Sequence, residues 1–124
     1  MNTSRNTFIN NIVESIQDIK GRNIVIADLT EIEDTICNYL IICQGTSSSQ
    51  VASIVEHIKE QTRLQMGESP LAIDGLKNAE WVAVDYADTV VHVFLPETRD
   101  FYRLETLWAD AKLKTIPDLD EYKL

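Results

Sequence analysis

Hydrophobic residues near the start of the chain recur every three or four positions, which is the spacing of one face of an α-helix. The positions concerned are Phe8, Ile9, Ile12, Val13 and Ile16. Because Gly21 follows as a stop signal, we expect a first amphipathic helix over Ser4–Lys20.

A second run with helical spacing follows the small residues Gly45-Thr46-Ser47 and consists of Val51, Ile54, Val55 and Ile58. Ser47 and Gln50 match the Ser-x-x-Gln capping box, in which the hydroxyl and the amide each satisfy a free backbone N–H group of the other residue. We expect this helix to reach Leu64 to Met66 and to stop at Gly67.

Short apolar runs predict strands between and after these helices. Ile24–Ala27 is short and rich in β-branched residues, and Tyr39–Cys43 is apolar throughout, as in a strand buried on both faces. An acidic connection, Leu29–Ile36, separates the two strands. Pro70–Asp74 is a weaker third strand, and the Asp74-Gly75 pair predicts a turn after it.

The stretch Glu80–Phe94 predicts a hairpin of two strands. If Ala87-Asp88 is its two-residue turn, the alternation of side chains places four valines on one face: Val82, Val84, Val91 and Val93. The other face then carries Trp81, Ala83, Asp85, Val90, His92 and Phe94. The valine face is ordinary core, whereas two large aromatic rings beside a carboxylate and an imidazole need a separate explanation.

Pro96 begins a last predicted helix, with Glu97 and Asp100 in its first turn, where the helix dipole favours negative charge. The packed stripe of this helix is predicted to be Phe101, Leu104, Leu107, Trp108 and Ala111, with Arg99, Tyr102, Arg103 and Glu105 freer to face outward. Residues Lys112–Leu124 are polar and contain Pro117, so we expect a tail that frays or lies as a short arm.

These elements predict one α/β domain over residues 1–124, with a mixed sheet of about five strands packed by helices. The hydrophobic fraction of 44% and the charged fraction of 25% are those of an average soluble protein. The longest apolar runs are far shorter than the roughly 20 residues that span a bilayer, and Met1–Asn10 lacks the apolar region of a signal peptide. We therefore expect a cytoplasmic protein without a membrane partner.

The net charge of −9 argues against broad binding to nucleic-acid backbone, which depends on clusters of Lys and Arg. A basic protein partner suits this charge better, although acidity that serves only solubility is the alternative. The two cysteines, Cys37 and Cys43, would lie roughly 20 Å apart on one extended strand, too far for a disulfide. We expect both to be reduced, and Cys43 to be a small core residue.

Enzymatic motifs are incomplete in this sequence. The Gly45-Thr46-Ser47 turn lacks the second Gly and the Lys of a Walker loop, and no acid-x-acid pair follows it to hold magnesium for nucleotide transfer. There is no Gly-x-Ser-x-Gly elbow, so Asp85 and His92 would form half of a triad without its nucleophile. Two cysteines and two histidines also provide no zinc ligand set. We expect no catalytic residue, no metal and no cofactor.

The hairpin and last helix, EWVAVDYADTVVHVFLPETRDFYRLETLW, resemble the ribosomal silencing factor family, also called the Iojap-like family. The resemblance extends upstream, in the expected order, through Asp28-Leu29, Asn38–Ile42, Gly45-x-Ser47-x-x-Gln50-Val51 and Asp74-Gly75, and it covers roughly Ile9–Ala111. The family's turn is usually Asp-Tyr-Gly-Asp, and Ala87 stands in place of the Gly, so a positive φ there would be strained. Ser48 and Ser49 replace basic residues that are common after the helix-opening Gly.

The resemblance implies a non-catalytic α/β protein with a nucleotidyltransferase-like topology that lacks the catalytic residues. It also implies binding to the large ribosomal subunit through the fourteenth ribosomal protein of that subunit, which lies on the intersubunit face. A factor bound there keeps the small subunit away by steric exclusion and represses translation when nutrients are short. An acidic factor suits this partner, because ribosomal proteins are basic.

On this interpretation the aromatic face of the hairpin is a docking patch for a protein partner. Its predicted residues are Trp81, Asp85, Tyr86, His92, Phe94, Arg99, Tyr102, Glu105 and Trp108, although the spacing of Trp108 favours the packed stripe. The alternative for Trp81 and Phe94 is a cross-strand pair buried under a helix. Two other functions stay open at this point: a nucleotide-transferring enzyme on a related fold, and a module that forms a homodimer through the same aromatic face.

Overall fold

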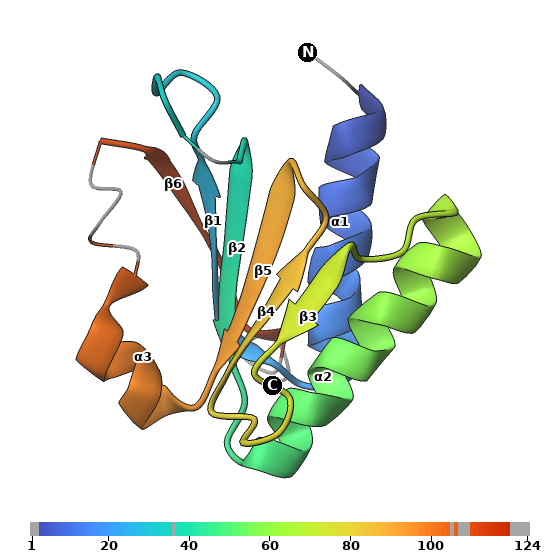
Figure 1. Cartoon of the computed structure of the whole chain (residues 1–124), viewed down its shortest axis with the longest axis vertical. Helices are drawn as coiled ribbons and strands as arrows, with labels where there is room; N and C mark the ends of the chain where they lie inside the picture. The colour runs from blue at the N-terminus through green and yellow to red at the C-terminus, as the bar shows by residue number, and fades with distance from the viewer. Residues whose placement is uncertain (1–2, 36, 105, 107–109, 120–124) are drawn as a thin grey trace.

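The computed structural model describes residues 3–35, 37–104, 106 and 110–119 (Figure 1). The elements are α1 (Thr3–Asp18), β1 (Arg22–Asp28), β2 (Tyr39–Gln44), α2 (Ser48–Gln61), β3 (Ala72–Asp74), β4 (Trp81–Asp85), β5 (Thr89–Phe94), α3 (Pro96–Tyr102) and β6 (Lys112–Ile116). A π-helical turn, η1 (Thr62–Met66), extends α2 as far as Gly67, which has a φ of 65°. None of the helices described here is long and apolar enough to cross a membrane.

The strands form one mixed sheet in the order β3-β4-β5-β2-β1-β6. The central pair, β2 and β5, is parallel, and the other neighbouring strands are antiparallel. Helices α1 and α2 lie together against one face of the sheet, whereas α3 lies on the other side (Figure 1). The predicted α/β class with a mixed sheet is confirmed, with one strand more than expected.

The main hydrophobic core lies between the sheet and the pair α1 and α2. Apolar side chains from the two predicted helical stripes, among them Phe8, Ile12, Ile54 and Ile58, are fully buried there. The sheet contributes the four valines predicted for one face of the hairpin, Val82, Val84, Val91 and Val93, each with no exposed surface. This face of the hairpin is therefore core, as the alternation of side chains predicts.

The capping box at the start of α2 is confirmed in one half only. The backbone N–H of Gln50 donates to Ser47 Oγ at 3.1 Å, as predicted. The Gln50 side chain, however, accepts from the backbone N–H of Thr46 at 2.6 Å rather than from Ser47, and its Nε2 donates to the carbonyl of Ile19 at 3.0 Å. Gln50 thus ties the start of α2 to the end of α1.

Two predictions for the C-terminal part of the chain are wrong. Residues Lys112–Ile116, expected in a polar tail, form β6, which pairs along its whole length with residues Ile24–Asp28 of β1. The last helix ends at Tyr102, because Arg103 adopts a left-handed conformation with φ of 46°, so the predicted stripe through Ala111 does not form on one helix. Leu107 and Trp108, two members of that stripe, lie outside the described residues.

The two-residue turn of the hairpin is confirmed. The backbone N–H of Tyr86 donates to the carbonyl of Thr89 at 2.8 Å, and that of Asp88 donates to the carbonyl of Tyr86 at 3.0 Å. Ala87 sits between them with a φ of 74°, the conformation that glycine adopts most easily. The Asp85 carboxylate accepts from the Ala87 N–H at 2.7 Å, and Arg5 donates to Asp88 Oδ1 at 2.7 Å, so side chains hold the turn from both sides.

We predict that Ala87→Gly raises the free energy of unfolding by about 0.5–1 kcal/mol, because glycine adopts a positive φ without the steric cost of a Cβ atom. Urea denaturation monitored by circular dichroism measures this change. As a matched control, Ala52→Gly within α2 should lower the stability by about 1 kcal/mol, because glycine is a poor helix former. A loss of stability in both variants would show that Ala87 is not strained.

Candidate protein-docking site

The face of the sheet opposite α1 and α2 carries the second set of hairpin side chains. The β4–β5 register pairs Trp81 with Phe94, Ala83 with His92, and Asp85 with Val90. Residues paired across antiparallel strands point to the same side, so these six side chains share one face, as the sequence predicts.

An aromatic cluster occupies this face and continues onto α3. We use the name aromatic cluster for Trp81, His92, Phe94, Phe101 and Tyr102. The Trp81 ring lies at its centre, stacked on Phe94 at 5.0 Å between centroids and tilted against Tyr102 at 4.8 Å and His92 at 5.9 Å. The rings of Phe101 and Tyr102 meet edge to face at 5.0 Å.

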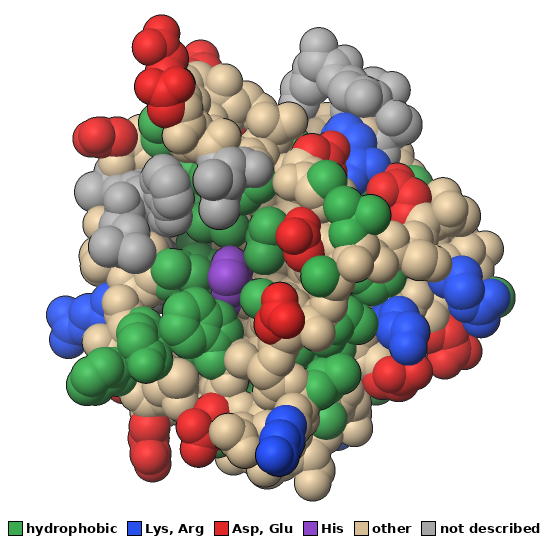
Figure 2. Space-filling view, in the orientation of Figure 1, with side chains coloured by type: hydrophobic (Ala, Val, Ile, Leu, Met, Phe, Trp, Pro, Cys, Tyr) green, Lys and Arg blue, Asp and Glu red, His purple; other side chains and the backbone are tan. Residues whose placement is uncertain are grey.

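Exposure increases from the base of the aromatic cluster to its tip. Phe94 is fully buried, and Trp81 and His92 are half-buried. Tyr102 is 51% exposed and Phe101 is 80% exposed at the end of α3. Figure 2 shows hydrophobic side chains gathered around a histidine on this face, with acidic side chains beside them. An aromatic surface anchored at its base and open at its tip suits contact with another protein.

His92 holds the Trp81 ring in place. The Trp81 Nε1–H group donates to His92 Nδ1 at 2.9 Å, which requires that this imidazole nitrogen carries no proton. Burial lowers the pKa of His92 to about 4, so the imidazole is neutral at physiological pH and keeps its acceptor. The indole N–H and the imidazole Nδ1 are therefore paired within the cluster.

The predicted docking residues do not all lie on this face. Tyr86 points to the side of α1 and α2, where it is 6% exposed, its hydroxyl lies 2.7 Å from Thr62 Oγ1, and its ring meets Phe8 edge to face. Burial also raises the pKa of the Tyr86 hydroxyl. Alternation along β4 puts Tyr86 with Val82 and Val84, so its assignment to the docking patch is wrong.

Arg99 is also buried, with 7% of its surface exposed, and its role is internal. Its guanidinium donates to the carbonyl of Asn23 at 2.6 Å and to Gln44 Oε1 at 3.2 Å, which contradicts an outward-facing docking side chain. Glu105 and Trp108 lie outside the described residues. Phe101, by contrast, belongs to the predicted packed stripe of the last helix. In the structure it is the most exposed ring of the cluster, so this prediction is wrong.

The side chains that enzymes most often use for catalysis have structural roles in this hairpin and core. The Asp85 carboxylate accepts from the turn N–H of Ala87, and His92 accepts from Trp81. Cys37 and Cys43 are buried free thiols, and burial raises the pKa of Cys43 to about 12, far from a reactive thiolate. Within the described residues, no group of three or more His, Cys, Asp or Glu side chains could hold a metal ion.

We predict that stability falls by roughly 2–3 kcal/mol between pH 6.5 and pH 4, because unfolded His92 binds a proton at its ordinary pKa whereas folded His92 does not until about pH 4. This contribution is fully present above pH 6.5. Urea denaturation across this pH range measures the stability of the parent and of His92→Asn. The variant keeps an acceptor for the Trp81 N–H but cannot titrate, so its stability should fall less. An identical pH dependence in the two proteins would contradict the assignment to His92.

Comparison with known proteins supports a ribosomal role. The family model described as "Ribosomal silencing factor during starvation" matches residues 2–123. Ribosomal silencing factor RsfS from Bacillus subtilis is 39% identical over 103 residues, which are 83% of each chain. Over 73 residues, 57% of this chain and 32% of the relative, the chain is 36% identical to mitochondrial assembly of ribosomal large subunit protein 1 from Mus musculus.

The fold is shared as well. A crystal structure of a protein from Chromobacterium violaceum superposes with a TM-score of 0.79 at 28% sequence identity, over 95% of this chain and 98% of the other. The family match spans nearly the whole chain, and the Bacillus subtilis relative is matched over most of its own length. The chain therefore belongs to the RsfS family and is a ribosomal silencing factor, a non-enzymatic ribosome-binding regulator that acts during starvation.

Proposed function

We propose that this silencing factor binds the large ribosomal subunit through the fourteenth ribosomal protein of that subunit and so blocks the small subunit from joining. A protein held at the intersubunit face excludes the small subunit by its volume, so repression needs no chemical step. The family description connects such proteins with silencing during starvation, and the name of the Mus musculus relative connects that protein with the large subunit.

The aromatic cluster carries the proposal. Phe101 and Tyr102 expose large apolar surface at the end of α3, and Trp81 connects them to the buried ring of Phe94. A soluble protein rarely exposes adjoining aromatic rings without a binding purpose, because their contact with water is unfavourable. Central aromatic side chains also contribute most of the affinity at many protein interfaces.

The proposed docking face consists of Trp81, Asp85, His92, Phe101 and Tyr102. Phe94 supports it from below, because Trp81 covers its ring. Trp81 and His92 enter the interface with their mutual hydrogen bond already made, so docking leaves neither the indole N–H nor the imidazole Nδ1 without a partner. The ring positions are thereby fixed before binding, which reduces the entropy lost on association.

Charge favours the approach of a basic partner. The chain carries 20 acidic and 11 basic residues, and Asp85 lies on the same face as the cluster. Complementary charge raises the rate of encounter, whereas buried aromatic contacts lengthen the lifetime of the complex. The acidic surface and the aromatic cluster therefore have separate roles in the same docking step.

We predict that Trp81→Ala weakens binding to purified large subunits by about thirtyfold or more, since truncating a central interface aromatic commonly costs 2 kcal/mol or more. Because Trp81 is only half-buried, the thermal transition of the variant should stay cooperative and within a few degrees of the parent. Co-sedimentation over a range of protein concentrations measures the affinity. Formation of whole ribosomes from the two subunits on sucrose gradients measures the loss of silencing.

Leu71→Ala is the matched control, because Leu71 is an apolar residue that is 74% exposed beside the edge strand β3. This variant should bind and silence as the parent does. Parent protein that binds both subunits equally, or neither, would contradict the proposed function. Trp81→Ala protein that is folded and binds like the parent would place the docking face elsewhere on the molecule.

A further inference from the structure

Helix α3 is attached to the rest of the protein in an unusual way. A helix that packs on a sheet normally buries a stripe of apolar side chains. Of the seven residues of α3, the buried one is Arg99, while Phe101 and Tyr102 at its end are exposed. The orientation of this helix therefore depends strongly on the groups that bind the Arg99 guanidinium.

Two of those groups lie where the pairing of β1 with β2 is irregular, one on each strand. Arg99 Nη1 donates to the carbonyl oxygen of Asn23 at 2.6 Å and to Gln44 Oε1 at 3.2 Å. The β1–β2 register shifts between the Arg22–Gln44 and Val25–Ile42 pairs, and Asn23 lies within this bulge with a φ of 53°. A bulge frees the backbone groups of the extra residue from strand pairing, so the Asn23 carbonyl can accept from a side chain.

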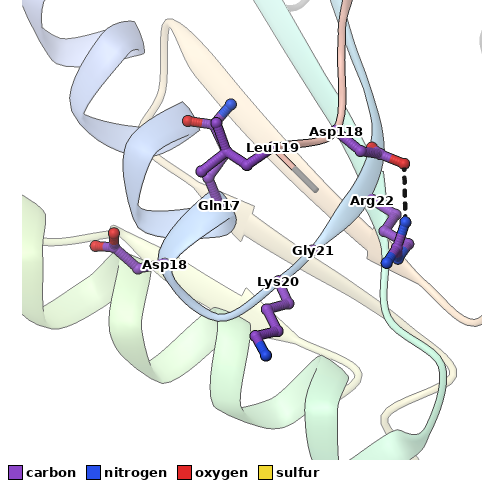
Figure 3. A pocket seen from close by; sticks show the side chains of 7 residues that line it. All are labelled: Gln17, Asp18, Lys20, Gly21, Arg22, Asp118 and Leu119. Atoms are coloured by element: carbon purple, nitrogen blue, oxygen red, sulfur yellow. Dashed lines mark hydrogen bonds and ion pairs between the residues drawn. The ribbon is translucent and has the colours of Figure 1, made fainter. Parts of the chain in front are cut away.

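The N–H group of Asn23 is bound from the other end of the chain. It donates to Asp118 Oδ1 at 3.0 Å, and Arg22 pairs with Asp118 Oδ2 at 3.3 Å. Figure 3 shows Asp118 extending from the segment after β6 toward Arg22, at the edge of a pocket beside the end of α1. Asp118 is only 8% exposed, so this hydrogen bond to Asn23 lies largely out of water, where it is stronger than at the surface.

We propose that Asp118 and Arg99 are positioning residues that act through the backbone of Asn23 to set the orientation of α3. Asp118 binds the N–H of Asn23 and so fixes the conformation of the bulge. The carbonyl of Asn23 in turn binds Arg99. Three residues along α3 from Arg99, Tyr102 lies against the Trp81 ring, 4.8 Å away. Asp118 thus acts on the geometry of the aromatic cluster through Asn23 and Arg99. The consequence for ribosome binding rests on the proposed function.

Two substitutions at Asp118 separate this hydrogen bond from the ion pair. Asp118→Ala removes the acceptor for Asn23, whereas Asp118→Asn keeps an acceptor oxygen and removes only the charge that faces Arg22. The indole N–H resonance of Trp81 in ¹⁵N-labelled protein reports the geometry of the cluster. This resonance is assigned by its absence from the spectrum of Trp81→Phe. We expect Asp118→Ala to shift this resonance and to bind large subunits about tenfold more weakly, and Asp118→Asn to resemble the parent in both.

Arg99→Lys tests the other end of the connection, because an ammonium group retains the charge but carries its donors on a shorter side chain, away from the position of Nη1. It should shift the same resonance and weaken binding as Asp118→Ala does, and it tests the proposal even if Asp118→Ala does not fold. Ser47→Ala removes the α2 cap but none of the hydrogen bonds given above for Asn23, Arg99 and Asp118, so it controls for general destabilisation and should leave the Trp81 resonance in place.

The outcomes distinguish this inference from the proposed function. If the parent does not bind large subunits, the proposed function is wrong, and the indole resonance of the free protein still tests the positioning. If the parent binds, and Asp118→Ala and Arg99→Lys both keep its affinity and its Trp81 resonance, the positioning role is overturned. A shift of equal size in Ser47→Ala would also overturn it, because the change would then reflect lost stability alone.

Discussion

The register of β4 against β5 is the constraint on which the rest of the structure depends. Side chains alternate along a strand, so a slip of one residue would reverse the two faces of one strand relative to the other. Either Trp81 of β4 or His92 and Phe94 of β5 would then point into the core, and the valines of that strand would point to the outer face. The turn at Ala87-Asp88 sets this register: Ala87 has a φ of 74° and its N–H donates to Asp85, while Arg5 donates to the Asp88 carboxylate. One short turn thus directs valines to α1 and α2 and aromatic rings to the outer face of the sheet.

Strong periodic patterns made most of the fold predictable. The two long helices, the hairpin register and the apolar strand β2 follow from spacing that the structure keeps. Strand β6 was missed because Lys112–Ile116 is an edge strand with four exposed residues, so burial leaves little apolar signal in the sequence. The end of α3 was missed because a non-glycine residue, Arg103, adopts the left-handed conformation that stops it.

The residues of the candidate site were predictable from the alternation of side chains along the strands. The prediction was wrong for residues to which this alternation was not applied. Trp81, Asp85, His92 and Phe94 share a face because they alternate with valines, and the same rule assigns Tyr86 to the core. Phe101 is predicted to be packed and Arg99 to face outward, but the structure shows the reverse: the Phe101 ring is exposed and Arg99 is buried. Helical spacing alone could not show this, because Arg99 donates to Asn23 in a bulge of β1 and to Gln44 at the end of β2, both distant from α3 in sequence.

A valine core on one face of the hairpin supports aromatic rings on the other face, and the proposed purpose of these rings is docking on the large ribosomal subunit. Replacing Phe101, the most exposed ring, with a photoreactive benzoyl-phenylalanine tests this claim most directly. Irradiation of the variant bound to purified large subunits should cross-link it to the fourteenth ribosomal protein, identified by mass spectrometry, whereas the same group at Leu71 should not. Cross-links from position 71 alone, or from position 101 to a different component, would contradict the proposed docking face.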